Sequence, residues 1–406
     1  MGSTWARVTI IQPSMHQYRV AFFEQLTNAL AEEGVDLQVR HGTPSATMRA
    51  RADSASPSWA RVLPTLSLSV AGRRITHHRL GPTAELGDLV IAEQAIRNLE
   101  TYLLLRGADR GGPPVAFWGH GTTMTKPHSS LERRLKAWMT SRAHWVFTYT
   151  EGGARQLTEL GYPAQRLTVV HNTVDTDSLV ANLAQLDPGE VESFRTAHGL
   201  LPGRTALFLG GLDDSKRLEF LAAACRRVYA ALPDFRLVVA GAGTRQDYLR
   251  SLSAEGWLVH LGPVFADRRA ILGAVSDIML MPGRVGLSII DAFALGLPLL
   301  TTDWPFHAPE LEYLDDGVTG AITPNSVEAF ATSTIAHLLD RPRLTRMQAA
   351  CRASVATHRL DRMVDSFRDG VLAALAAPRT TPGTHRAVAA RGQDHSRVRH
   401  CNTQST

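Results

Sequence analysis

Short apolar runs alternate with amphipathic stretches along almost the whole chain. The run ARVTIIQP at 6–13 has the apolar character of a buried strand, and in RVAFFEQLTNALAEEG at 19–34 the apolar residues recur with helical spacing. Further strand-like runs are VDLQVRHG, DLVIAEQ, PVAFWGHG, WVFTYTE and LTVVHNT, with helical patterns such as SSLERRLKAWMTSR and GARQLTELG between them. This β-α-β-α order predicts a parallel sheet with helices on both faces.

A second cycle of the same kind begins near residue 205. Its strand-like runs are TALFLGGL, FRLVVAGAG, WLVHLGPV, DIMLMPG and LPLLTTD, again separated by helical patterns. The predicted fold class is α/β, with two doubly wound, Rossmann-like domains facing across a cleft that would take ligands at the carboxyl ends of the strands. We expect a first domain over 1–175, a hinge over 176–204, a second domain over 205–357, a bracing helix over 358–377 and a disordered tail over 378–406.

Composition and charge narrow the class of protein. A hydrophobic content of 44% and a charged content of 20% are typical of a soluble globular chain, and the longest apolar runs are too short to cross a bilayer. The N-terminus lacks the pattern of a signal peptide, and Cys225, Cys351 and Cys401 have no metal-ligand or C-x-x-C spacing, so we expect a cytoplasmic protein. The tail holds five Arg and one Asp, which accounts for most of the net charge of +5, so the charge does not indicate a nucleic-acid partner.

The stretch PGRVGLSIIDAFALGLPLLTTD at 282–303 carries the first candidate chemistry. Gly286, Leu287 and Ser288 open a helix whose free amides and dipole favour an anion such as a phosphate, although a simple capping loop explains the same residues. Asp291 lies among apolar neighbours on that helix. An acid in such a position should face a cleft or be paired.

These motifs occur in an order that resembles a known family. GGLDDSK, VVAGAG, HLGPV, SDIMLMPG and VGLSIIDAFALGLPLLTTD are similar to the C-terminal domain of the family 4 glycosyltransferases (glycosyltransferase group 1), which have the GT-B fold. QYRVAFFEQL, WGHG and VVHNTVDTDSL resemble the N-terminal domain and hinge of that family. The resemblance covers roughly residues 7–375.

The resemblance implies a hexosyltransferase-type enzyme that moves a sugar from a nucleotide sugar to a hydroxyl acceptor with retention of configuration. The C-terminal domain would bind the donor and the N-terminal domain the acceptor, which could be a sugar, a lipid-linked or a small molecule in the synthesis of a polysaccharide, a glycolipid or a natural product. No cofactor and no metal are expected. The same resemblance leaves two alternatives, a catalytically degenerate sugar-binding subunit and a nucleotide-sugar epimerase on the same fold.

The resemblance also implies roles for individual residues. Lys216 matches the lysine that neutralises the donor diphosphate, where charge develops as the glycosidic bond breaks. His120 matches a histidine beside the donor sugar, and Asp291 matches the second acid of the E-x7-E pattern, which accepts hydrogen bonds from the ribose. The residues expected to bind the nucleotide sugar are Gly210, Gly211, Gly286, Leu287, Ser288 and Arg284.

The chain departs from the family pattern at two positions. The first acid of E-x7-E falls on Gly283, and Gly211 stands where the family usually has a phosphate-binding arginine. We expect Arg284 to supply the missing positive charge, with a solvated loop residue as the alternative. These departures keep the non-catalytic alternative open.

Acceptor contacts are expected after strands of the first domain. Tyr18, Arg19 and Glu93 follow strand-like runs and would lie at the cleft edge, where Arg19 could meet an acceptor phosphate; Tyr18 could equally belong to the core. The helix ERRLKAWMTSRAHW at 132–145 carries four basic residues and two tryptophans. It could lie on the inner face of an anionic membrane, but an ordinary helix with inward tryptophans is the favoured interpretation.

Overall fold

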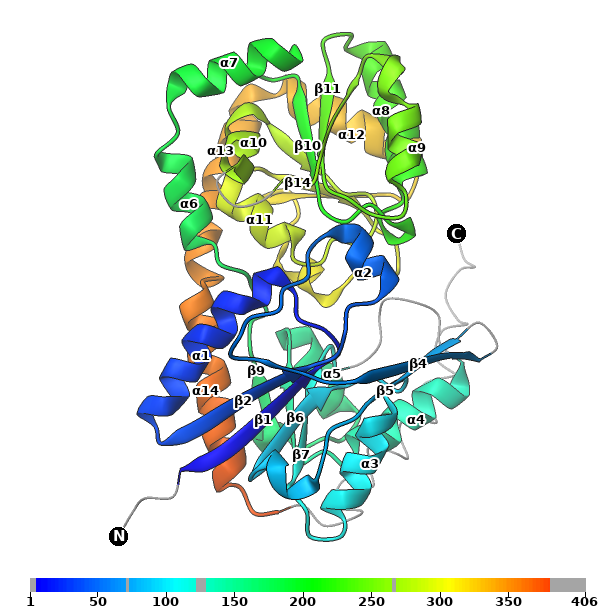
Figure 1. Ribbon diagram of the computed structural model, residues 1–406. Helices are drawn as coiled ribbons and strands as arrows, with labels where there is room; N and C mark the ends of the chain where they lie inside the picture. Colours follow the sequence, from blue (N-terminus) through cyan, green and yellow to red (C-terminus); the bar gives the residue numbers. More distant parts are fainter. Residues whose placement is uncertain (1–4, 71–72, 122–128, 265–267, 380–406) are drawn as a thin grey trace, which may run out of the picture. The chain divides into compact units, whose positions relative to one another are not determined.

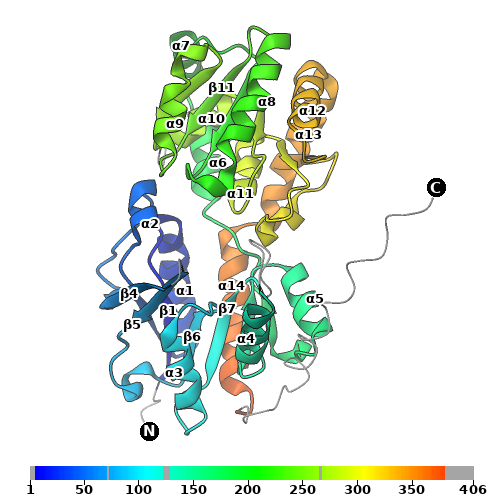
Figure 2. The same cartoon turned by 90° about the vertical axis from the view of Figure 1, so that its right-hand side faces the viewer.

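The computed structural model describes residues 5–70, 73–121, 129–264 and 268–379, so residues 380–406 of the predicted tail lie outside the described residues. Two compact units are present. Unit 1 comprises Met1–Pro44, Ala55–His171 and Met363–Thr406, and unit 2 comprises Ser45–Ser54 and Asn172–Arg362. In each unit, helices cover both faces of a parallel sheet, as Figures 1 and 2 show, so the predicted pair of doubly wound domains is confirmed.

Unit 1 is built on a seven-stranded parallel sheet with the order β3-β2-β1-β6-β7-β8-β9. Its strands are β1 (Ala6–Gln12), β2 (Val35–His41), β3 (Arg61–Val62), β6 (Leu89–Glu93), β7 (Val115–Gly119), β8 (Trp145–Thr148) and β9 (Leu167–Val169). An antiparallel hairpin, β4 (Thr65–Val70) with β5 (Arg73–His78), is inserted before β6. The sequence pattern did not predict this hairpin.

The helices of unit 1 fill both faces of its sheet. They are α1 (Val20–Glu32), α3 (Leu99–Ala108), α4 (Ser130–Thr140), α5 (Glu151–Glu159) and most of α14 (Leu360–Ala376). Neighbouring strand residues point to opposite faces: Phe117 packs in the core on the α3 and α4 side, whereas the Trp118 ring lies 5.0 Å from that of Phe367 in α14. Phe367 also contacts Phe22 of α1 and stacks on Phe147, so α1 and α14 cover the same face.

Unit 2 has a six-stranded parallel sheet with the order β12-β11-β10-β13-β14-β15. Its strands are β10 (Thr205–Leu209), β11 (Arg236–Ala240), β12 (Leu258–Gly262), β13 (Ile278–Leu280), β14 (Leu299–Thr302) and β15 (Gly320–Thr323). Its helices are α2 (Ala46–Arg51), α6 (Asp177–Ala184), α7 (Pro188–His198), α8 (Leu218–Ala231), α9 (Gln246–Ser251), α10 (Arg268–Val275), α11 (Ser288–Leu295), α12 (Val327–Leu339) and α13 (Arg341–Ser354). The sequence pattern had assigned no element to β15, α12 or α13.

The chain passes between the units at positions that differ from the predicted domain limits. The segment 172–204, which includes the predicted hinge, belongs to unit 2 and carries α6 and α7. Residues 45–54, placed by the pattern inside the first domain, also belong to unit 2, and the predicted bracing helix begins in unit 2 and continues in unit 1.

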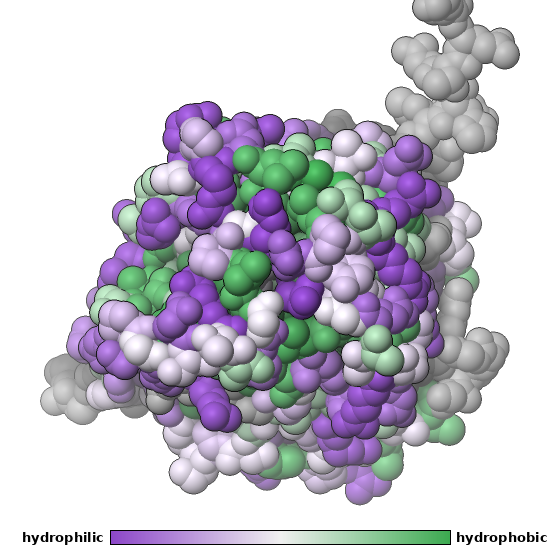
Figure 3. Space-filling view, turned by 90° about the horizontal axis from the view of Figure 1, so that it is seen from above, coloured by the Kyte–Doolittle hydropathy of each residue, from purple (hydrophilic) through white to green (hydrophobic). Residues whose placement is uncertain are grey.

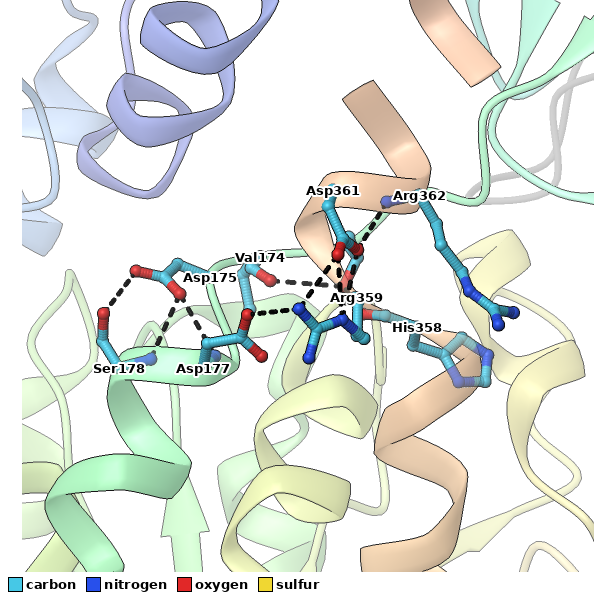
Figure 4. Close-up of polar contacts among 9 residues, drawn as sticks. Val174, Asp175, Asp177, Ser178, His358, Arg359, Asp361 and Arg362 are labelled. Atoms are coloured by element: carbon cyan, nitrogen blue, oxygen red, sulfur yellow. Dashed lines mark hydrogen bonds and ion pairs between the residues drawn. The ribbon is translucent and has the colours of Figure 1, made fainter. Parts of the chain in front are cut away.

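The two ends of the main segment of unit 2 are tied together (Figure 4). Thr173 Oγ1 donates to the carbonyl of His358 at 2.6 Å, and Arg359 pairs with Asp177 at 3.0 Å and with Asp361 at 2.9 Å. These contacts fix the point at which the chain enters unit 2 against the point at which it leaves.

Both sheets have the strand order of a doubly wound fold. In each sheet, successive strands are added first on one side of the first strand and then on its other side, so the strand order reverses there. The reversal lies between β1 and β6 in unit 1 and between β10 and β13 in unit 2. In such sheets the crevice at this reversal, at the carboxyl ends of the strands, is the usual ligand site. Most of the candidate residues follow these strands.

Candidate functional site

The loops after β10 and β13 of unit 2 interlock through their backbones. The short turn η4 (Asp214–Lys216) follows β10, and the Arg284 amide after β13 donates to the carbonyl of Ser215 at 2.9 Å. The ammonium of Lys216 donates in return to the carbonyl of Arg284 at 2.5 Å. The sequence therefore brings Lys216 and Arg284, 68 residues apart, to one place at the sheet edge.

Gly283 explains why the family's first acid is absent. A Cβ atom at this position would lie 2.4 Å from the carbonyl oxygen of Ser215 and 2.8 Å from the Cα of Lys216. Real Cβ atoms do not approach backbone atoms so closely, so any side chain here would displace the turn that carries Lys216. The two loops can therefore come this close only because position 283 has no side chain.

The ammonium of Lys216 lies in a setting that is poor in water, although the side chain as a whole is only half-buried. Desolvation by burial lowers the pKa of Lys216 from 10.5 to about 8. The positive charges of Arg51 and Arg284 act in the same direction, against the carboxylates of Asp213 and Glu310. A lysine held among other cations in this way is suited to an anionic ligand, which would restore the charge balance.

A third cation reaches this place from α2. Arg51 forms an ion pair with Asp213, whose carboxylate also accepts the amide of Ser215 at 2.9 Å and its hydroxyl at 2.5 Å. Burial raises the pKa of Asp213, but the hydrogen bonds from Ser215 and the charges of Arg51 and Lys216 outweigh burial and hold it below its usual value. Sequence reasoning missed Arg51, because α2 carries no strand-end signal, and it gave Asp213 no role although that residue lies in the GGLDDSK motif after β10.

The start of α11 has the geometry expected of an anion-binding turn. Gly286 has a φ of 53°, a left-handed conformation that favours glycine, and it leads directly into Leu287 at the helix N-cap. The hydroxyl of Ser288 donates to the carbonyl of Leu209 at 3.2 Å, which fixes the helix start to the end of β10. Gly210 lies beside this contact, since a Cβ atom there would be 3.5 Å from Ser288 Oγ. The first amides of a helix have no partners within it and point toward a ligand.

Asp291 is paired rather than isolated. Its carboxylate forms an ion pair with Arg269 of α10, and only 15% of the Asp291 side chain is exposed. This ion pair explains how a carboxylate can lie in an apolar helix. The sequence did not indicate Arg269 as its partner. The predicted role of Asp291 as a ribose acceptor stays a prediction.

His307 and Glu310 follow β14 and lie close to Lys216. The imidazole of His307 donates from Nε2 to the carbonyl of Thr302 at 2.9 Å and accepts the amide of Val285 at Nδ1. Burial lowers the pKa of His307, and the neighbouring cations lower it further, so the ring is neutral at pH 7. Glu310 is buried and accepts from Asn172 at 2.5 Å.

In unit 1, His120 follows β7 and is half-buried. Its ring lies edge-on to that of Tyr149, which follows β8, at 4.8 Å between centroids. The amide of Tyr149 donates to the carbonyl of Gly119 at 3.1 Å and extends the pairing of the two strands. The structure therefore places His120 at the carboxyl edge of the sheet, where it was predicted to be; its contact with a sugar stays a prediction.

Arg19 and Tyr18 differ sharply in exposure. Arg19 is 5% exposed, with its guanidinium 4.9 Å from the centroid of the Trp118 ring and a contact to the sulfur of Met363. Tyr18 is 36% exposed and stacks on His16 at 5.0 Å. The surroundings of Arg19 are those of a structural cation held by aromatic rings, whereas Tyr18 is accessible to an acceptor.

Glu93 closes β6 within a polar cluster of unit 1. Its carboxylate accepts from Asn98 at 3.1 Å and lies 3.8 Å from the guanidinium of Arg97. Lys136 of α4 is close enough for the Glu93 charge to act on it; desolvation nevertheless lowers the pKa of Lys136 to about 8. Glu93 thus has partners of its own, and its predicted acceptor contact remains to be tested.

The two tryptophans of the basic stretch 132–145 lie in different elements, because α4 ends at Thr140 and holds Trp138, whereas Trp145 begins β8. Trp145 is buried and donates to the hydroxyl of Thr168 at 2.8 Å, while Trp138 is 36% exposed and stacks on Tyr102. Leu131 is 69% exposed at the start of the helix. Figure 3 shows the molecule from above the view of Figure 1, and on that face, which is not the α4 surface, apolar residues form small groups among hydrophilic ones. No helix among the described residues is long and apolar enough to cross a membrane.

Within the described parts of the chain, no group of three or more His, Cys, Asp or Glu side chains could hold a metal ion. Cys225 and Cys351 are buried free thiols, and burial raises the pKa of both. Metal-independent chemistry remains a prediction.

Two family models match the chain, one in each half. The model described as glycosyl transferases group 1 matches residues 203–340, and the model described as glycosyltransferase family 4 matches residues 20–178. Among curated proteins, a glycogen synthase of Mycobacterium tuberculosis is 24% identical over 360 residues, covering 80% of this chain and 83% of its own.

Solved structures share the fold over nearly their full length. A protein of Anabaena, HepE, solved with UDP and glucose, has a TM-score of 0.64 and 16% identity, with 90% of this chain and 99% of that chain covered. A glycosyltransferase of Rickettsia africae has a TM-score of 0.65 and 14% identity, with 92% and 100% covered. A sucrose-phosphate synthase of Thermosynechococcus elongatus has a TM-score of 0.63 and 14% identity, with 90% and 98% covered.

Proposed function

We propose that this chain, which belongs to the group 1, family 4 glycosyltransferases of the GT-B fold, transfers a sugar with retention to a hydroxyl of a carbohydrate acceptor. As a member of that family it is a hexosyltransferase-type enzyme that uses nucleotide-sugar donors. The observation that carries the proposal is the set of cations at the loops after β10 and β13, with Lys216 at its centre. A nucleoside diphosphate supplies the negative charge that this set lacks.

Lys216 and Arg284 would bind the diphosphate of the donor. The two side chains extend from loops that are locked together, so their positions are fixed before the ligand arrives. The amides of Gly286, Leu287 and Ser288 would add hydrogen bonds and the positive end of the α11 dipole. A preorganised cation of this kind stabilises the leaving group without reorganisation at the moment of reaction.

The remaining parts of the donor would be held by other predicted residues. Asp291, oriented by its ion pair with Arg269, would accept hydrogen bonds from the ribose hydroxyls. His120 would contact the transferred sugar, with Tyr149 setting the plane of its ring. Tyr18 and Glu93 are the acceptor contacts that exposure and position support best in unit 1.

The proposed reaction breaks the bond between the anomeric carbon and the diphosphate oxygen. The acceptor oxygen forms its bond to that carbon on the same face, which retains the configuration, and the acceptor proton passes to the departing phosphate oxygen. Lys216 stabilises the charge that grows on the diphosphate, so we expect no metal requirement. The anomeric proton coupling of the product would test retention, and activity in excess EDTA would test metal independence.

Uridine diphosphate sugars are the first donors to examine. HepE was solved with UDP and glucose, and the pneumococcal transferase GtfA, at a TM-score of 0.60, with UDP and GlcNAc. The glycogen synthase relative makes a glucan or another growing polysaccharide the first acceptor to examine.

Gly283 and Gly211 also suggest a degenerate, non-catalytic subunit as an alternative. The structure supports a different reason for Gly283, since it allows the loops of Lys216 and Arg284 to meet. An epimerase would require several acids placed for proton transfer, whereas Asp213, Asp291 and Glu310 are all engaged with protein partners. We therefore favour transfer over both alternatives.

The test is the thermal stability of the purified protein with UDP-, GDP- and TDP-sugars. A ligand that binds the folded state alone must raise Tm, so one nucleotide class should stabilise the wild type. Lys216→Ala and Asp291→Ala should lose that shift while keeping a cooperative transition. Equal shifts in wild type and Lys216→Ala would contradict the proposed donor site, and turnover of the donor without transfer to any acceptor would favour hydrolysis or isomerisation.

We also propose that α4 can contact an anionic membrane surface when the acceptor is lipid-linked. The exposed side chains of Leu131 and Trp138 lie on a helix that also carries Arg133 and Arg134. Sedimentation with vesicles of phosphatidylglycerol and phosphatidylcholine should be reduced by Trp138→Ala together with Leu131→Ser. Equal sedimentation of the double variant would exclude this contact.

A further inference from the structure

We propose that Arg51, from the short helix α2, is a direct ligand of the donor diphosphate and takes the place that Gly211 leaves empty. The inference rests on the proposed function, because it adds a residue to the same donor site. Neither the predicted site residues nor the sequence motifs include Arg51. It is separated from its partner Asp213 by 162 residues.

The position of the Arg51 side chain is the first argument. A Cβ atom at Gly211 would lie 2.8 Å from Nε of Arg51, 3.1 Å from its Cδ and 3.3 Å from its Cζ. The guanidinium of Arg51 therefore occupies the space into which a side chain at 211 would extend. Gly211 follows β10 at the sheet reversal, so this space is at the carboxyl edge of unit 2.

The charge balance is the second argument. Arg51 lies close enough to Lys216 and Arg284 for its charge to lower the pKa of both. Three cations, Lys216, Arg51 and Arg284, thus lie near the two carboxylates of Asp213 and Glu310, so the positive charges exceed the negative ones by one. Only 31% of the Arg51 side chain and 12% of the Asp213 side chain are exposed, so water compensates this excess charge poorly.

The chemistry of the guanidinium is the third argument. Asp213 fixes one edge of Arg51, while the same carboxylate is held in place by the amide and hydroxyl of Ser215. Guanidinium has five N–H donors in a planar fork, so it can keep the carboxylate on one edge and bind phosphate oxygens with another. Arg51 is therefore oriented toward the diphosphate before it binds.

The chain leaves unit 1 after Pro44 and returns to it at Ala55. Residues 45–54, which lie between these points, belong to unit 2. Ser45 caps the start of α2, with its side chain accepting the amide of Met48 at 3.3 Å. The ion pair of Arg51 with Asp213 joins this short segment to the loop that carries Lys216. A diphosphate bound to Arg51 would add a second link between them.

The experiment is calorimetric titration of UDP, GDP and TDP into the full chain at low salt. The variants are Arg51→Ala, Gly211→Arg and the two combined, and Arg49→Ala is the matched control because Arg49 is exposed on the same short helix. We expect Arg51→Ala to weaken binding about ten- to hundredfold, as for the loss of a hydrogen bond between charged groups. Arg49→Ala should leave the affinity within about twofold of wild type, because an exposed charge is screened by solvent.

Gly211→Arg in the Arg51→Ala background is the decisive variant. It places a guanidinium in the space that Arg51 leaves, so we expect most of the lost affinity to return. Affinity of Arg51→Ala equal to wild type would overturn the inference while leaving the proposed function intact. A loss that the second change does not restore would assign Arg51 to the positioning of Asp213 and contradict direct binding. If wild type itself binds none of the three diphosphates, both the proposed function and the inference are wrong.

Discussion

The two parallel sheets, one in each unit, share the doubly wound strand order, but the charged residues at their carboxyl edges are held very differently. In unit 2, Lys216 and Arg284 extend from interlocked loops and share one region with Arg51. In unit 1, the comparable cation Arg19 is enclosed by the rings of Trp118 and its neighbours. A strand-end position therefore does not make a ligand site by itself.

Charge balance distinguishes the two regions. The rings around Arg19 supply a diffuse negative partner from within the protein, and the side chain is 5% exposed. In unit 2, Lys216, Arg51 and Arg284 together carry one charge more than the nearby acids Asp213 and Glu310, and desolvation holds the pKa of Lys216 at about 8. A bound anion would neutralise the excess positive charge around Lys216 in unit 2, whereas the aromatic rings already compensate the charge of Arg19 in unit 1.

The largest expected effect comes from removing the central cation of unit 2. Lys216→Met keeps the apolar stem and deletes the charge, so kcat/KM for sugar transfer should fall about 10²- to 10³-fold, the usual cost of losing one preorganised electrostatic contact. Arg19→Met in unit 1 should leave the donor KM nearly unchanged. Steady-state kinetics of both variants would decide, and a larger effect of Arg19→Met on donor KM would reverse the comparison.

The next effect concerns the contact between the two loops of unit 2. Gly283→Ala places a Cβ 2.4 Å from a backbone oxygen, so we expect a loss of about 1–3 kcal/mol of stability and a Tm lower by roughly 2–4 °C per kcal/mol. Gly107→Ala in α3 of unit 1 is the control, because a Cβ there would meet nothing within 4 Å. Calorimetric scanning should show the control at or above the wild-type Tm; equal Tm values for all three proteins would refute the close packing at Gly283.

Donor affinity should also depend on pH in a way that belongs to unit 2. An anion favours the protonated form of Lys216, so affinity should be flat between pH 7 and the lysine pKa of about 8. Above it, binding must take up a proton, and Kd should rise by up to about tenfold per pH unit. Calorimetry from pH 7 to 9.5 would measure this rise. Lys216→Arg, whose charge persists over this range, should give a flatter profile; an identical slope would exclude Lys216 as the titrating group.

The smallest expected effect is at the ribose. Asp291→Asn keeps the shape and removes the charge that pairs with Arg269, so the affinity for a nucleoside diphosphate should fall about three- to tenfold, as for one or two hydrogen bonds. The matching 2′,3′-dideoxynucleoside diphosphate should bind wild type and variant alike. If the variant weakens the dideoxy ligand by the same factor, Asp291 does not contact the ribose hydroxyls.

The alternation of strands and helices was predictable because each buried parallel strand is a continuous apolar run bounded by turn residues. The hairpin of β4 and β5 was missed, because TLSLSV alternates polar and apolar residues, RRITHH has one apolar residue among six, and neither is the continuous apolar run that marked the other strands. The end of the chain was missed at β15 and α12 for a simpler reason. Those elements follow the last motif that the family resemblance supplied.

The candidate site was predictable only where it follows a strand in the sequence. Lys216 and Gly286 could be located from the runs before them, and the structure brings both to the edge of the unit 2 sheet. The contribution of Arg51 depends on residues 45–54, which belong to unit 2 although the segments before and after them belong to unit 1. The local hydrophobic pattern does not predict this. The aromatic enclosure of Arg19 likewise depends on Trp118, a strand residue nearly 100 positions later.

The central claim is that the donor diphosphate binds to the loops after β10 and β13 of unit 2. Hydrogen–deuterium exchange of the unmodified protein, with and without saturating nucleoside diphosphate, tests this claim directly. The account predicts new protection in peptides covering 209–217 and 283–291, and little change in those covering 16–23 of unit 1. Protection confined to unit 1, with the exchange of 209–217 unchanged, would contradict it.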